Sequence, residues 1–152
     1  MTSAVALKGE AREVALAEAQ VVLSMAREDS MRLKLAELVA ACDEGGVDDA
    51  DAELLENVLE LGLQTGRIRA YYGPGGEQAA ISTLRKLPRG RARADSTREV
   101  SDALQSLAGT RLDAVKITAV APGVFTLAIE TDGFALSVRL DPQGARLASV
   151  AT

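Results

Sequence analysis

The spacing of apolar residues changes near residue 110, and this change constrains the fold more than any other feature of the sequence. Before that point, apolar residues recur every three or four positions, which is typical of helices that bury one side. From about residue 112 onwards, apolar and polar residues alternate, which is typical of strands with one buried face. The sequence therefore predicts an α+β fold with about five helices at 4–109, followed by a four-stranded antiparallel β-meander at 112–151 that packs on them.

The length and the apolar content favour one core. A chain of 152 residues, of which 47% are hydrophobic, is long enough to enclose one, so we expect a single α+β domain spanning 4–152. Aromatic residues make up only 3% of the chain, so Leu, Val, Ile and Ala must fill this core. Alanine buries little area per residue, and we therefore expect modest stability unless the protein oligomerises.

The first two helices are separated by a short polar segment. The first is expected at 4–27 and carries apolar residues on two faces, so it packs against several neighbours within the chain or meets a second protomer. The second is expected to begin at Asp29 or Ser30, which are suitable N-caps, and to end at the glycine pair 45–46. One long helix at 4–44 is the alternative.

Glycine and proline delimit the next helices. The third is expected to begin in the acidic segment 48–53 and to continue along an apolar seam to about Tyr72. The Gly-Pro-Gly-Gly segment at 73–76 ends it, and a fourth helix follows as far as Pro88. An arginine-rich connector then leads to a fifth helix at 96–109.

The Gly-Pro-Gly-Gly segment at 73–76 raises the question of a phosphate-binding loop. Such a loop follows a strand and is itself followed by a lysine, whereas here the preceding segment is helical and Glu77 stands where a cation would be useful. We interpret the segment as a corner between two helices. Weak anion binding at the start of the fourth helix, helped by Arg67 or Arg69, is the alternative.

Turn sequences separate the expected strands. Pro122-Gly123 suits a type II turn, Asp132-Gly133 is a strong signal for a tight hairpin, and the segment 141–144 suits a type I turn. The alternating runs lie at 115–119, 125–129, 134–140 and 145–151.

Most catalytic chemistries lack the residues that they need. The chain contains no histidine, which removes the commonest general base and the commonest transition-metal ligand. Cys42, the only cysteine, lies on an apolar stripe next to Asp43 and Glu44, so we interpret it as a buried small side chain. The acidic cluster at 43–51 lacks the spacing of a calcium-binding loop, and helix capping explains most of it. We therefore expect no enzyme, no cofactor and no metal site.

The N-terminal region and the net charge indicate a cytoplasmic protein that does not enter membranes. Glu10, Glu13 and Glu18 interrupt the region where a signal peptide would need an apolar run. No apolar stretch approaches the roughly 20 residues of a membrane span. The net charge of −5 also disfavours nonspecific binding to nucleic acid or anionic lipid.

Positive charge is concentrated in one segment. Residues 67–98 hold 8 basic and 2 acidic side chains, whereas residues 1–66 hold 5 basic and 14 acidic ones. Either the basic side chains form solvated ion pairs with the acidic first and third helices, each worth about 0–1 kcal/mol, or they stay exposed and bind an acidic partner or a nucleic-acid backbone. The candidate partner-binding residues are Arg67, Arg69, Arg85, Lys86, Arg89, Arg91, Arg93 and Arg98.

These features predict a non-enzymatic protein–protein interaction module. We expect an adaptor, a scaffold subunit or a chaperone-like factor that binds another protein and self-associates into a homodimer or a larger homo-oligomer. Two alternatives remain at this stage. One is a regulatory nucleic-acid-associated protein that uses the Arg-rich segment 85–98, and the other is a small-ligand-binding domain.

Overall fold

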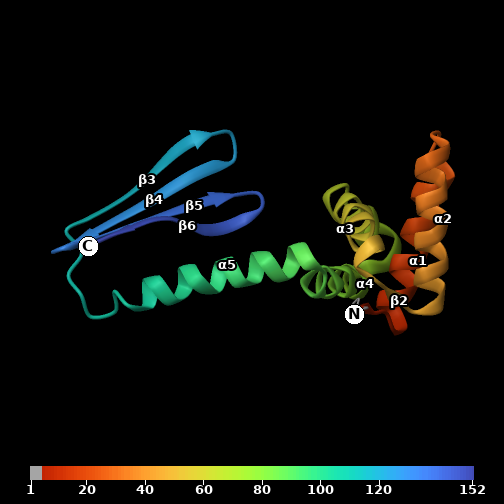
Figure 1. The fold of residues 1–152 in the computed structure, drawn as a ribbon, viewed down its shortest axis with the longest axis horizontal. Helices are drawn as coiled ribbons and strands as arrows, with labels where there is room; N and C mark the ends of the chain where they lie inside the picture. Colours follow the sequence, from red (N-terminus) through yellow and green to blue (C-terminus); the bar gives the residue numbers. More distant parts are fainter. Residues whose placement is uncertain (1–4) are drawn as a thin grey trace. The chain divides into compact units, whose positions relative to one another are not determined.

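The computed structural model describes residues 5–152, and within them the predicted α+β class is confirmed (Figure 1). Helices occupy the first part of the chain, and a four-stranded antiparallel sheet follows them. Residue 4, where the first helix was expected to begin, lies outside the described residues. The elements in chain order are β1 (Val5–Ala6), α1 (Gly9–Met25), α2 (Asp29–Glu44), β2 (Gly46–Val47), α3 (Asp49–Gln64), α4 (Arg67–Lys86), α5 (Pro88–Gln105), β3 (Ala114–Ala121), β4 (Val124–Thr131), β5 (Phe134–Asp141) and β6 (Gly144–Ala151).

The chain forms two compact units, and the boundary between them falls inside α5. The helical unit extends to Arg91, and the C-terminal unit spans Ala92–Thr152. The single domain at 4–152 stays a prediction.

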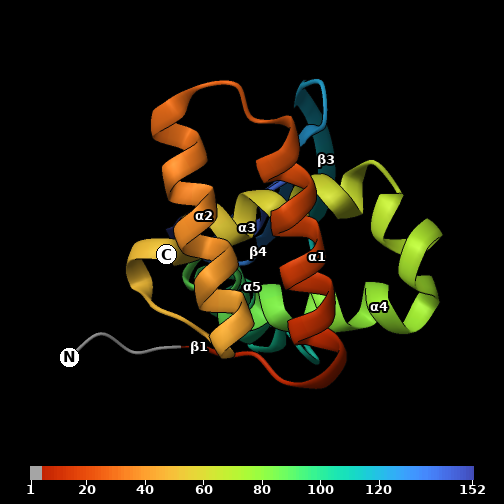
Figure 2. The ribbon, with the colours of Figure 1, turned by 90° about the vertical axis from the view of Figure 1, so that its right-hand side faces the viewer.

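The core of the helical unit lies among α1, α2, α3 and α4 (Figure 2). The leucines of α2 and α3 are among its largest members, and Leu35, Leu38 and Leu55 are fully buried. Ala15 and Ala19 of α1 are also fully buried, and their small side chains let this helix approach its neighbours closely. α1 contacts α2, α3 and α4, and these neighbours cover most of its two apolar faces, whereas Met25 at its last position is 63% exposed.

Two short strands in the helical unit had no signal in the sequence. Val5 pairs with Val47, and Ala6 pairs with Gly46, in an antiparallel ladder of two residues on each side. Gly45 has φ 88° and ends α2, which allows its carbonyl to accept a 2.8 Å hydrogen bond from the amide of Leu7. The segment expected to be the start of the first helix is therefore a strand, and α1 begins only at Gly9.

The predicted third helix is too long. α3 ends at Gln64, and Gly66 takes up the left-handed conformation, with φ 75°, before α4 begins at Arg67. The apolar seam continues to Tyr72 because Ile68, in the first turn of α4, is buried in the same core as α3. The apolar seam therefore correctly predicted that Ile68 faces the core, but it wrongly predicted one continuous helix.

The Gly-Pro-Gly-Gly segment at 73–76 is a corner, as predicted, but it lies within α4. Gly73 has φ 71° and ψ −174°, which breaks the helix into two segments, and Pro74 begins the second (Figure 2). Arg69 and Glu77 lie on either side of this corner, with their charged groups 3.4 Å apart.

The arginine-rich segment after Pro88 is helical, which corrects the prediction of a connector. Leu87 is extended, and Pro88 is the first residue of α5, a position where its missing N–H has no helical partner to lose. Arginine and alanine, which dominate the segment, favour helix. A Cβ on Gly90 would lie 1.8 Å from the carbonyl oxygen of Leu84, so only glycine allows α5 to begin this close to the end of α4.

The C-terminal unit contains the predicted meander, with strand order β3-β4-β5-β6 (Figure 1). Gly123 and Gly133 have φ 73° and 77° and lie in the first two turns. One face of the sheet packs against the end of α5 and the turn that follows it. This core contains Val100, Ala103, Leu107, Ile129, Leu136 and Val138.

Candidate functional site: an apolar cleft in the helical unit

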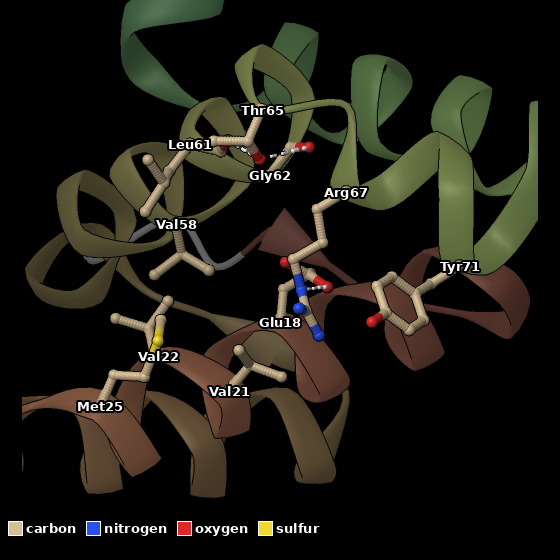
Figure 3. Close-up of a pocket in the computed structure, with 10 residues that line it drawn as sticks. All are labelled: Glu18, Val21, Val22, Met25, Val58, Leu61, Gly62, Thr65, Arg67 and Tyr71. Carbon is tan, nitrogen blue, oxygen red and sulfur yellow. Dashed lines mark hydrogen bonds and ion pairs between the residues drawn. The ribbon is translucent and has the colours of Figure 1, made fainter.

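A cleft of about 360 Å³ opens between α1, α3 and the first turns of α4 (Figure 3). Most of its lining is apolar, and we call it the apolar cleft. Its apolar side chains are Val21, Val22, Met25, Val58, Leu61 and Tyr71. Its other lining residues are Glu18, Gly62, Thr65 and Arg67.

Two helix faces with the same spacing build the walls of the apolar cleft. On α1, the lining residues lie at positions 18, 21, 22 and 25, and on α3 and its C-cap they lie at 58, 61, 62 and 65. Both sets follow the i, i+3, i+4, i+7 pattern of one helix face. Arg67 and Tyr71, four residues apart on α4, close the remaining side.

The rim of the apolar cleft exposes large apolar side chains, whereas its floor is buried. Met25 is 63% exposed, Leu61 is 48% exposed and Tyr71 is 70% exposed. Val58, between them, is only 3% exposed. Contiguous apolar surface of this kind commonly marks a binding site.

A buried carboxylate, that of Glu18, lies beside the cleft and forms an ion pair with an arginine of α4. Glu18 is 2% exposed, and its Oε1 accepts a hydrogen bond of 3.1 Å from the Nε–H of Arg67 (Figure 3). The hydroxyl of Tyr72 also donates a hydrogen bond to Glu18. Burial raises the pKa of Tyr72, the negative charge and hydrogen bond of Glu18 raise it further, and the cation of Arg67 opposes them.

Two further contacts fix the geometry around this carboxylate. The guanidinium carbon of Arg67 lies 4.5 Å from the ring centroid of Tyr71, a cation–π contact that holds the arginine at the rim. A Cβ on Gly62 would lie 2.7 Å from Ile68 Cδ1 and 3.0 Å from Glu18 Oε2. The missing side chain of Gly62 is therefore what allows α1 and α4 to approach α3 here.

The side chains of Glu18 and Thr65, which line the cleft, are already engaged by other residues. Thr65 is the only hydroxyl of an aliphatic side chain in the lining, and it donates a 2.8 Å hydrogen bond to the carbonyl of Leu61, four residues earlier. Glu18 is engaged by Arg67 and Tyr72, so the cleft pairs no nucleophile with a free base. Within residues 5–152, no three histidine, cysteine or carboxylate side chains come together as a metal site requires.

Cys42, the one thiol, is fully buried in the core of the helical unit. Burial, with a smaller contribution from the negative charge of Asp51, raises its pKa to about 11. The thiol is therefore protonated near neutral pH, as its interpretation as a core side chain requires.

Two of the eight predicted partner-binding residues contact buried carboxylates. One is Arg67, as described above. The other is Arg89, whose Nε lies 2.5 Å from Glu56 Oε2 and whose Nη1 lies 3.5 Å from Glu60. Glu56 is 2% exposed, and because this oxygen has no hydrogen-bond partner among the described atoms, its contact with Arg89 is an ion pair. Arg67 thus pairs with a carboxylate of α1, and Arg89 pairs with one of α3. The prediction was that such ion pairs would be solvated, but Glu18 and Glu56 are buried.

The remaining six basic residues fall into smaller groups. Arg85, Lys86 and Arg91 lie around a shallow concavity beside β1, where Arg91 Nε donates a 2.7 Å hydrogen bond to the carbonyl of Lys86. Arg69 pairs with Glu77 in the same unit. In the C-terminal unit, Arg93 donates a 2.6 Å hydrogen bond to Gln143, and Arg98 lies 3.7 Å from Asp95. Their role in partner binding stays a prediction.

The apolar cleft was not predicted from the sequence. The signal that could have revealed it is the repeated spacing on α1 and α3, but Glu18 and Gly62 interrupt the apolar pattern of both faces.

No protein-family model matches this chain, and no curated protein or solved structure is significantly similar to it. None of the described helices is both long and apolar enough to span a bilayer.

Proposed function

We propose that this chain is a non-enzymatic protein-interaction module whose apolar cleft receives one face of a helix from a partner protein. The observation that carries this proposal is the apolar rim of Met25, Leu61 and Tyr71 around a buried floor. A helix laid in such a groove inserts apolar side chains spaced by three and four residues. Full burial of each large apolar side chain contributes about 1.5–3 kcal/mol. Because association itself costs several kcal/mol, we expect the partner helix to insert at least three such anchors.

Arg67 gives this partner helix a preferred chemistry. Its Nε–H is engaged by Glu18, whereas its Nη groups carry further N–H donors at the rim of the cleft. A carboxylate next to the apolar anchors of the partner would accept hydrogen bonds from these donors. We therefore expect an amphipathic helix with an acidic residue beside its apolar face.

The cellular role follows from these expectations. We expect the protein to act in the cytoplasm as an adaptor, a scaffold subunit or a chaperone-like factor, and to self-associate. The absence of histidine from the chain, the buried thiol and the paired carboxylate in the cleft support a role without catalysis.

A cross-linking experiment tests the cleft directly. A photo-reactive amino acid at Met25 is expected to cross-link a partner protein in cells of the source organism. The yield is expected to fall at least tenfold when Leu61→Asp is added, because a charge at the rim cannot be buried against an apolar anchor. Leu33→Asp is the matched control, since Leu33 on α2 is 65% exposed and does not line the cleft. Equal cross-linking in the Leu61→Asp and Leu33→Asp proteins would reject the cleft as the binding surface.

Small-ligand binding is the alternative that the cleft itself supports. A volume of about 360 Å³ lies at the lower end of the range of roughly 300–1,000 Å³ for ligand pockets. A thermal-shift screen with metabolites distinguishes the two functions. Stabilisation of the unaltered protein that is lost in the Leu61→Asp variant, together with no protein cross-linked at Met25, would favour a small ligand.

The nucleic-acid alternative depends on another surface. Arg85, Lys86 and Arg91 form the basic group that it would use. Fluorescence anisotropy with labelled oligonucleotides at low salt tests it, because phosphate contacts strengthen as salt falls. Binding at low salt that is lost on reversing these three charges would support this alternative, and no binding would reject it.

A further inference from the structure

The outer edge of β3 differs from the other edge of the sheet. All eight residues of β3 are exposed, including Val115 at 55%, Ile117 at 61% and Val120 at 61%. On the opposite edge, β6 is partly covered, its register with β5 is interrupted near Ser137, and Arg146 forms an ion pair with Asp141. Interruptions and charges of this kind protect sheet edges against pairing.

β3 and β6 each contain one charged residue and one register shift, but the shift in β6 lies within the strand and the shift in β3 lies near its end. The register of β3 with β4 is regular from residue 114 to residue 119 and shifts only near the end of the strand. Lys116 is its single charged residue, and it contains no proline. A long, regular and mostly uncharged edge strand offers an unpaired row of backbone donors and acceptors to another strand.

The apolar face of β3 continues the face that α5 covers elsewhere in the sheet. Ile117 lies opposite Leu127 of β4, which in turn lies opposite Val138 of β5, so these side chains share one face. Val138 is 1% exposed, whereas Ile117 is 61% exposed. The core between α5 and the sheet draws its buried members from β4 and β5 and none from β3. The apolar face of the sheet therefore extends one strand beyond its cover.

We propose that β3 pairs with β3 of a second copy of this chain, antiparallel and with Ile117 at the twofold axis, so that two four-stranded sheets become one of eight strands. This inference specifies the self-association included in the proposed function, and it does not depend on the apolar cleft.

The side-chain pattern of β3 fits its own copy. With Ile117 at the axis, Lys116 lies opposite Thr118 of the second copy, so the two lysines do not face one another. Val115 lies opposite Ala119, and Ile117 lies opposite Ile117, which keeps the apolar residues of both copies on the same face. Opposite residues in an antiparallel pair lie on the same face of the sheet. The apolar faces of the two copies therefore coincide only when odd-numbered residues lie opposite odd-numbered residues, so that the residue numbers of each pair add up to an even number.

The two neighbouring even registers fit less well. With Lys116 at the axis, the two lysines would lie opposite one another. With Thr118 at the axis, Lys116 would lie opposite Val120, and Ile117 would lose its contact with a second isoleucine. That register would also include Ala121, beyond the point where the pairing with β4 shifts. The regular part of the strand therefore favours the axis at Ile117.

Mass measurement by light scattering at increasing protein concentration tests the association. The mass is expected to rise from the chain mass of 15.9 kDa towards twice that value. Ile117→Lys is expected to remain at the chain mass, because it places two charges opposite one another at the axis. Val150→Lys is the matched control, since Val150 is 52% exposed and lies on the other edge strand, so it is expected to dimerise like the unaltered protein. Circular dichroism establishes that both variants are folded.

Cysteine cross-linking tests the register in the 152-residue chain. Ile117→Cys is expected to form a covalent dimer on mild oxidation, because the two residues would face one another across the axis. In the same register, the two copies of Val120 would be about 20 Å apart, at about 3.4 Å per residue, so Val120→Cys is expected to remain largely uncross-linked. The native Cys42 is buried and does not compete.

Three results would overturn the proposal. They are a constant mass of 15.9 kDa at every concentration, dimerisation that survives Ile117→Lys, and cross-linking of Val120→Cys or Thr118→Cys that is as fast as that of Ile117→Cys. The cleft is tested separately, because Leu61→Asp is expected to remain dimeric and Ile117→Lys is expected to retain cross-linking at Met25.

Discussion

The carboxylate of Glu18 lies 3.1 Å from the guanidinium of Arg67, and this ion pair joins the middle of α1 to the first turn of α4. The carboxylate is 2% exposed, whereas the arginine side chain is one-third exposed. A buried charge is costly without a partner, so the pair holds α4 in place beside the apolar cleft. The same arginine thus stabilises the fold, and its Nη groups are the donors that the proposed function assigns to a partner helix.

Removal of the arginine should destabilise the protein. Arg67→Ala leaves Glu18 buried without a cation, and we expect the free energy of unfolding to fall by about 2–3 kcal/mol. This is less than the 3–5 kcal/mol for fully buried pairs, because water reaches the arginine. Urea denaturation measures the change. Arg69→Ala is the matched control, since Arg69 is 67% exposed and its pair with Glu77 is on the surface, and it should change stability by less than about 1 kcal/mol. Equal losses in the two variants would show that Glu18 is not the cause.

A methyl group at Gly62 should be poorly tolerated. In an unconstrained helix, Gly→Ala stabilises by about 1 kcal/mol, but here the new Cβ would lie 2.7 Å from the side chain of Ile68. Since Ile68 is fully buried and cannot move away freely, we expect Gly62→Ala to destabilise the protein by about 1–3 kcal/mol. Thermal unfolding measures the effect. At Gly75, which also lies in a helix, the nearest atoms to a new Cβ belong to the exposed carboxylate of Glu10, which can move, so Gly75→Ala should be neutral or stabilising by up to about 1 kcal/mol. A stabilised Gly62→Ala protein would contradict the close contact between α3 and α4.

The fold class could be predicted because its signals are local. The period of the apolar residues and turn sequences such as Asp132-Gly133 act within a few residues, and they predicted the helical part and the order of the strands. Helix boundaries were wrong where the outcome depends on which glycine adopts a positive φ. Both Gly66 and Gly73 do so, although the apolar seam continues past Gly66 to Tyr72. The pairing of β1 with β2 could not be seen because strands of two residues have no period.

The candidate site could not be predicted because its geometry is not local. Glu18 lies in a stretch of the sequence that gives no indication of burial, and the arginine that allows burial stands 49 residues away. Glu56 is likewise buried because Arg89 reaches it from α5. The concentration of arginine at 67–98 was visible in the sequence, but the division between inward ion pairs and surface groups depends on how the helices pack.

Burial should make Cys42 unreactive, and its ionisation should make stability fall at high pH. Its pKa is raised from 9.0 to about 11, so at pH 8 the folded protein holds roughly a hundredfold less thiolate than an unfolded chain, at tenfold per pKa unit. A thiol reagent should therefore react slowly until urea is added. Because the pKa of Cys42 is higher in the folded than in the unfolded state, the thiol stabilises the folded protein. This contribution to the free energy of unfolding is fully present below pH 9 and is lost as the pH rises from 9 towards 11. The pKa of Tyr72 is also raised, which acts in the same direction.

Unfolding by urea at pH 8 and at pH 10.5 measures this pH dependence. In the Cys42→Ala protein, the free energy of unfolding should fall less between the two pH values. The fall that is due to Tyr72 should remain. Rapid labelling of the folded protein at pH 8, or the same pH dependence in Cys42→Ala, would contradict the burial of the thiol.

The corner at Gly73 should depend on glycine for backbone reasons alone. Its φ of 71° with ψ of −174° lies in a region that residues with a Cβ avoid, although a Cβ there would meet no atom within 4 Å. We therefore expect Gly73→Ala to destabilise the protein by about 1–3 kcal/mol through strain, without any clash. Gly66, with φ 75° and ψ 2°, is in the left-handed helical region that asparagine tolerates, so Gly66→Asn should cost less. Urea denaturation of the two variants measures the difference. Calorimetric titration with phosphate then tests whether this corner also binds anions. We expect no heat in the unaltered protein, whereas phosphate binding that Gly73→Ala abolishes would support the anion-binding alternative.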